Sequence, residues 1–123
     1  MQAPLRGVPT VRRLKTYQSG TGCTWTYCYE GFRDQSSPVS GRAFEFTLQS
    51  SGAPPLRLTV LIPDSTGSAV AEQIGRDIAP RELYALAKMH LFSVLDRETV
   101  LESDGRTSLA SAEAMEIWEL LDL

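Results

Sequence analysis

The sequence predicts an α+β domain, with a four-stranded antiparallel sheet from residues 11–62 packed on one face by two or three helices from residues 64–121. Before Pro63, apolar and polar residues alternate with period two, which is typical of half-buried strands. After Pro63, apolar residues recur at spacings of three and four, as they do on amphipathic helices. The charge changes at the same place. Residues 1–62 hold seven Lys/Arg against three Asp/Glu, and residues 63–123 hold five against twelve.

Four strands are predicted in the N-terminal half. Residues 11–18 and 23–33 flank a turn, and the second of these runs is rich in Thr, Tyr and Trp. Gly31 interrupts its alternation, which indicates a bulge or a strand end. Residues 41–49 and 56–62 alternate cleanly, and the short turns between all four runs favour an antiparallel meander. The first strand is poorly amphipathic and charged, so we expect it at an edge of the sheet.

The C-terminal half predicts helices. Asp64 or Ser65 is the expected N-cap of a short helix that Gly75 closes. Pro80 suits the first turn of a second helix, which extends to about Arg97. Residues 102–107 are expected to form a turn before a third helix. Residues 1–10, with Pro and Gly and no periodic pattern, are expected to be a flexible arm on a single domain of residues 11–123.

The composition limits the class of protein. The length of 123 residues is typical of one domain, and no apolar run is long enough to span a bilayer. The N-terminus has no apolar segment of the kind found in signal peptides, so we expect a soluble cytoplasmic protein that does not enter a membrane. A net charge of −3 argues against strong general attraction to nucleic acid or anionic lipid.

Few residues suggest chemistry. Cys23 and Cys28 are an odd number of residues apart, so on a strand they point to opposite faces and should remain separate thiols. Two cysteines and one histidine do not suit a zinc site, which normally has four ligands. His90, the single histidine, lies on the apolar stripe of the second helix and is interpreted as a core residue. We therefore expect no cofactor and no metal, and we lean against an enzyme.

The most suggestive pattern combines aromatic and basic residues on the first two strands. Aromatic rings can stack on bases while cations hold phosphates. The alternative is that one aromatic face forms the core under the helices while the cations keep the other face wet. The candidate binding residues are Arg12, Arg13, Lys15, Trp25, Tyr27, Tyr29 and Arg33.

The sequence therefore favours a small non-catalytic binding or adaptor domain that contacts its partner through the sheet half. A protein partner or a second copy of the chain is the first expectation, and single-stranded nucleic acid is the second. Two alternatives remain open. One is an acidic inhibitor or immunity-type protein acting through the helical half, and the other is a small enzyme that uses Cys28 or His90.

Overall fold

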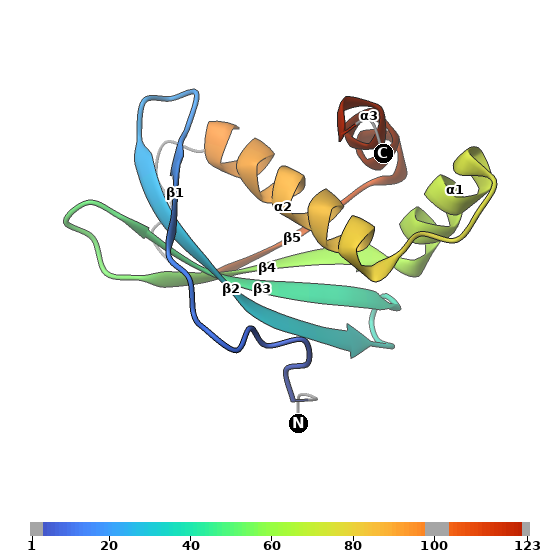
Figure 1. Ribbon diagram of the computed structural model, residues 1–123, viewed down its shortest axis with the longest axis horizontal. Helices are drawn as coiled ribbons and strands as arrows, with labels where there is room; N and C mark the ends of the chain where they lie inside the picture. Colours follow the sequence, from blue (N-terminus) through green and yellow to red (C-terminus); the bar gives the residue numbers. More distant parts are fainter. Residues whose placement is uncertain (1–3, 98–103, 122–123) are drawn as a thin grey trace.

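A computed structural model describes residues 4–97 and 104–121. One five-stranded sheet has the order β1-β2-β3-β4-β5, and all three helices lie on the same face of it (Figure 1). The first three strand pairs are antiparallel, and β5 lies parallel to β4. The elements in chain order are β1 (Lys15–Gln18), β2 (Thr24–Gln35), β3 (Gly41–Ser50), β4 (Leu56–Pro63), α1 (Asp64–Ile74), α2 (Pro80–Arg97), β5 (Gly105–Ser108) and α3 (Ser111–Leu121).

The α+β class and the four-stranded antiparallel meander are confirmed, but the prediction misses the fifth strand. Residues 102–107 were expected to form a turn; residues 102 and 103 lie outside the described residues, and Gly105–Ser108 pairs with β4 in parallel. The Asp104 carboxylate accepts a hydrogen bond from the backbone N–H of Arg57 at 2.7 Å, which holds the start of β5 against β4. The four residues of β5 include no large apolar side chain, so their sequence has no alternation that would indicate a strand. The pairing depends instead on the exposed edge of β4.

The bulge expected at Gly31 is present, and the N-terminal arm pairs with β2 beside it. The register between β2 and β3 shifts between Tyr29 and Gly31, where Gly31 adopts a φ of 131°. Arg6 pairs with Phe32 through two backbone hydrogen bonds of 2.8 and 2.9 Å, so the arm runs along β2. A side chain on Gly31 would meet the carbonyl oxygen of Arg6 at 2.8 Å, and glycine is therefore required there.

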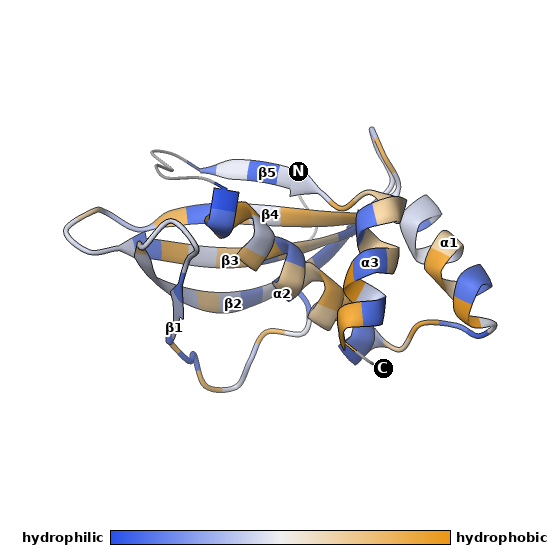
Figure 2. Cartoon of the chain, turned by 90° about the horizontal axis from the view of Figure 1, so that it is seen from above, coloured by the Kyte–Doolittle hydropathy of each residue, from blue (hydrophilic) through white to orange (hydrophobic). Residues whose placement is uncertain are grey.

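The hydrophobic core lies between the sheet and the helices. Figure 2 shows α2 lying across the sheet, with α1 and α3 together at one end. Trp25 of β2 is 2% exposed, which places the aromatic face of β2 on the core side of the sheet. The other fully buried large side chains come from β3, β4, α1, α2 and the segment before α3, and they include Phe44, Phe46, Leu48, Val60, Val70, Leu86, Leu91, Leu95 and Leu109.

The helix ends agree with the prediction except at the start of α1. Gly75 closes α1 in the left-handed conformation with a φ of 75°, and α2 has the expected bounds. The N-cap is Pro63, because β4 continues directly into α1 without a connecting loop. The backbone N–H of Asp64 instead bonds the carbonyl oxygen of Ser40 at 2.9 Å. Within the described residues, no helix has both the length and the apolar character needed to cross a membrane.

Candidate anion-binding pocket

The seven candidate residues lie on β1, on β2 and just before β1, and they are divided between the two faces of the sheet. Lys15 lies opposite Tyr27 in the β1–β2 register and shares its face, which is the face the helices cover. The structure brings four candidates together at one cavity, and they are Arg13, Lys15, Tyr27 and Tyr29. Trp25 is buried in the core, and Arg12 and Arg33 form ion pairs with acids of β2 and β3.

The ion pairs hold Arg12 and Arg33 away from the cavity. Arg12 bonds the Glu30 carboxylate at 2.8 Å, and this hydrogen bond, more than any other contact, lowers the pKa of Glu30. Arg33 and Arg57 lie 3.0 and 3.5 Å from the carboxylate of Glu45, a residue that is buried on the uncovered face of the sheet. These cations neutralise acids of their own sheet, so a phosphate would have to displace a carboxylate to reach them.

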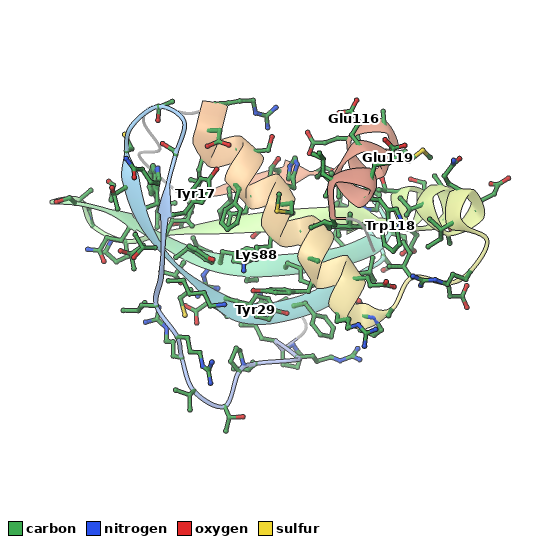
Figure 3. All side chains as sticks on the ribbon, turned by 45° about the horizontal axis from the view of Figure 1, so that its top comes forward. Tyr17, Tyr29, Lys88, Glu116, Trp118 and Glu119 are labelled. Atoms are coloured by element: carbon green, nitrogen blue, oxygen red, sulfur yellow. The ribbon has the colours of Figure 1, made fainter. Side chains whose placement is uncertain are left out.

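The cavity, which we name the arm pocket, has a volume of about 320 Å³. The N-terminal arm and β1 form one wall, β2 contributes two tyrosines, and α2 contributes a third. Figure 3 shows Tyr29 and Lys88 on the side of α2 that faces the arm. The lining residues are Pro9, Thr10, Val11, Arg13, Lys15, Tyr27, Tyr29 and Tyr84.

The three tyrosines of the arm pocket are available as hydrogen-bond donors. Within the described part of the chain, the hydroxyls of Tyr27, Tyr29 and Tyr84 form no hydrogen bond. Burial raises the pKa of all three, to about 12 for Tyr29, so the hydroxyls stay protonated at neutral pH. The rings of Tyr29 and Tyr84 lie 4.7 Å apart between centroids, so the two tyrosines pack against each other in the wall of the arm pocket.

Cations without partners adjoin these donors. Arg13 and Lys15 are exposed, and neither forms an ion pair with any described residue. The Lys15 charge opposes the effect of burial on the pKa of Tyr27, as expected for a cation close to that hydroxyl. The Lys88 ammonium lies 5.9 Å from the centroid of the Tyr27 ring. Phenolic donors beside an ammonium and a guanidinium form a site for a carboxylate or a phosphate.

His90 has polar partners that the sequence did not reveal. Its Nδ1 pairs with the Glu113 carboxylate of α3, and its Nε2 lies 2.8 Å from the Thr107 hydroxyl of β5. Hydroxyl, imidazole and carboxylate in this order resemble a hydrolytic triad. Neither Thr107 nor His90 lines the arm pocket, and His90 is buried between α2, β5 and α3. We interpret the cluster as a polar connection that joins these three elements, which confirms the burial expected for His90.

The remaining residues with possible chemistry are the two cysteines. Cys23 and Cys28 are free thiols, as predicted. Cys28 is buried, and this burial raises the pKa of its thiol, which makes it a weak nucleophile at neutral pH. Among the described residues, no group of three or more His, Cys, Asp or Glu side chains could hold a metal ion.

Comparison with known proteins does not identify a relative. No family model, no curated protein and no solved structure matches the chain.

Proposed function

We propose that the chain is a non-catalytic binding module that recognises an acidic segment of a protein partner through the arm pocket. One observation carries the proposal. Arg13 and Lys15 have no ion pair among the described residues, and they meet three tyrosine hydroxyls without hydrogen-bond partners at one cavity. Two cations and three neutral hydrogen-bond donors without partners at one cavity favour an anionic ligand.

A carboxylate from a protein suits this site better than a nucleic acid does. A base would need an accessible ring on which to stack, but Trp25 and Tyr27 are buried beneath the helices. A polyanion would also need a row of available cations, whereas Arg12 and Arg33 are already paired with acids. A cavity of about 320 Å³ accommodates one or two side chains of a partner.

The test is a titration of ¹⁵N-labelled protein with hexaglutamate. We expect amide shifts at the arm, β1 and β2, and an affinity that decreases as salt is added. Lys15→Glu should weaken binding about tenfold or more, because it places an acid beside the ligand. Tyr84→Phe should weaken it by a factor of about 2–10, the usual net value of one hydrogen bond.

Arg81→Glu is the matched control, because Arg81 is an exposed cation of α2 outside the arm pocket. It makes the same change in net charge and should leave the affinity for hexaglutamate nearly unchanged. Circular dichroism melts of each variant confirm that the fold is intact. Equal effects of Lys15→Glu and Arg81→Glu would contradict the proposal. Tighter binding of a thymidine octanucleotide at the same amides would favour nucleic acid instead.

A further inference from the structure

We infer that the partner of the arm pocket is a second copy of this chain. In this arrangement the basic arm of one copy docks against an acidic groove between α1 and α3 of another copy. The inference rests on the proposed function, because the carboxylates of α3 are the acidic segment that the arm pocket receives.

The groove between α1 and α3 is apolar inside and acidic outside. Its volume is about 260 Å³, and Figure 3 shows Trp118 on the side of α3 that faces α1. The two helices together carry five Asp/Glu and no Lys or Arg. The lining residues are Val70, Gln73 and Ile74 of α1 and Met115, Trp118 and Glu119 of α3.

The cation nearest the groove is already neutralised. The Arg76 guanidinium lies 5.5 Å from the centroid of the Trp118 ring, and it donates two hydrogen bonds of 2.9 Å to the Glu82 carboxylate. Glu116 and Glu119 are exposed, and neither forms an ion pair with a described residue. Glu119 lines the groove, and Glu116 lies one turn before it on α3. The groove and its rim therefore offer two acids to a partner that supplies cations beside apolar side chains.

The N-terminal arm has this composition. Val8, Val11 and Leu14 are between 57% and 65% exposed, and Arg13 and Lys15 flank Leu14 in the sequence. Exposed apolar side chains gathered on one segment mark an interaction site. Of the five exposed large apolar side chains in the described residues, these three lie on the arm or next to β1, and Leu120 on α3 is a fourth.

The two surfaces therefore match in both polarity and charge. An aliphatic side chain of the arm would enter the groove against Met115 and Trp118, residue types that adapt well to a partner. Arg13 and Lys15 would then meet Glu116 and Glu119. The arm and the α1–α3 pair lie on separate parts of the molecule, so the contact forms between copies (Figure 1). Two different surfaces meet in it, so copies assemble into a chain or a ring, or exchange arms reciprocally.

Sedimentation velocity over a concentration series tests the inference. We expect the weight-average sedimentation coefficient to rise with protein concentration at low salt and to fall when salt is added. Lys15→Glu and Glu119→Lys should each weaken self-association about tenfold. The double variant carrying both substitutions in one chain should recover it, because residues 15 and 119 of neighbouring copies then again carry opposite charges.

Arg81→Glu and Asp77→Lys are the matched controls, because both positions are exposed and lie outside the arm pocket, α1 and α3. They should leave self-association unchanged. A monomer at all concentrations would overturn the inference, as would a double variant that associates no better than the single variants. If hexaglutamate binds wild-type protein that is monomeric, the proposed function of the arm pocket is supported and only self-association is refuted. If the wild type self-associates, the double variant recovers self-association and hexaglutamate does not bind, general recognition of acidic segments is refuted. The contact between copies is then still supported.

Discussion

Glu45→Gln tests whether the cations of the uncovered sheet face are structural. The Glu45 side chain is 8% exposed, and its carboxylate is paired with Arg33 and Arg57 and accepts a hydrogen bond from the Thr59 hydroxyl. Glutamine preserves the volume and one acceptor oxygen but removes the charge. The substitution therefore removes the negative charge of Glu45 from beside two guanidinium groups.

The expected cost follows from the exposure of the two arginines. Removing one partner of a fully buried ion pair costs about 3–5 kcal/mol. Arg57 is 39% exposed and is screened by solvent, so its share is about 0–1 kcal/mol. Arg33 is 22% exposed and retains partial access to water, which reduces its share below that of a fully buried pair. We expect Glu45→Gln to lower the free energy of unfolding by about 2–4 kcal/mol.

Urea unfolding followed by circular dichroism measures this change. The control is Glu72→Gln, at an exposed position on α1, which should shift the free energy of unfolding by less than about 0.5 kcal/mol. Hexaglutamate affinity should be unchanged in Glu45→Gln, because Glu45 does not line the arm pocket. A loss below about 1 kcal/mol, within the range of exposed pairs, would show that the ion pairs of Glu45 contribute no more than exposed pairs do, and would refute the reasoning.

Three further predictions concern the stability of the helical layer. Hydrogen bonds from Arg76, and then from the backbone of Ala79, hold the pKa of Glu82 at about 2, below its ordinary value of 4.5. The stability that Glu82 contributes is therefore present above pH 4.5 and is lost as the pH falls toward 2. Urea midpoints at pH 6 and pH 2 should differ less in Glu82→Gln than in the wild type, and an equal difference would contradict this assignment. Ile117→Ala empties a buried site on α3 and should cost about 2–5 kcal/mol in urea unfolding, whereas a negligible loss would mean that α3 does not pack as described. His90→Leu should accelerate amide hydrogen exchange in β5 and α3 more than in β2, and uniform acceleration would contradict a local connection.

The alternation of apolar and polar residues was sufficient to predict the strands whose own sequence alternates. The clean alternation of residues 41–49 and 56–62 predicted β3 and β4, and the break at Gly31 predicted the bulge. β5 could not be predicted, because its pairing depends on the edge of β4 and not on its own four polar residues. The same holds for the Pro63 cap, which exists because a strand and a helix meet without a loop.

The candidate site was predictable only in part. The sequence named Lys15 and Tyr27 as candidates, but their shared face depends on the β1–β2 register, which the alternation alone does not specify. The ion pair of Arg12 with Glu30 was not predicted, because it too depends on how the segment before β1 lies against β2. Tyr84 was missed, because it reaches the arm pocket from a helix whose packing direction the pattern of α2 does not specify.

The most direct test of the arm pocket follows the four tyrosines individually during a hexaglutamate titration. The ring ¹³Cζ resonance reports hydrogen bonding by the hydroxyl, so a bound carboxylate should shift it for Tyr27, Tyr29 and Tyr84 with one common dissociation constant. Tyr17 is an internal control, because its hydroxyl already donates to the Asp96 carboxylate at 2.7 Å. We predict that the three resonances of the pocket move while that of Tyr17 does not. Unchanged resonances at all four tyrosines, or a shift of Tyr17 as large as the others, would contradict an anion site in the arm pocket.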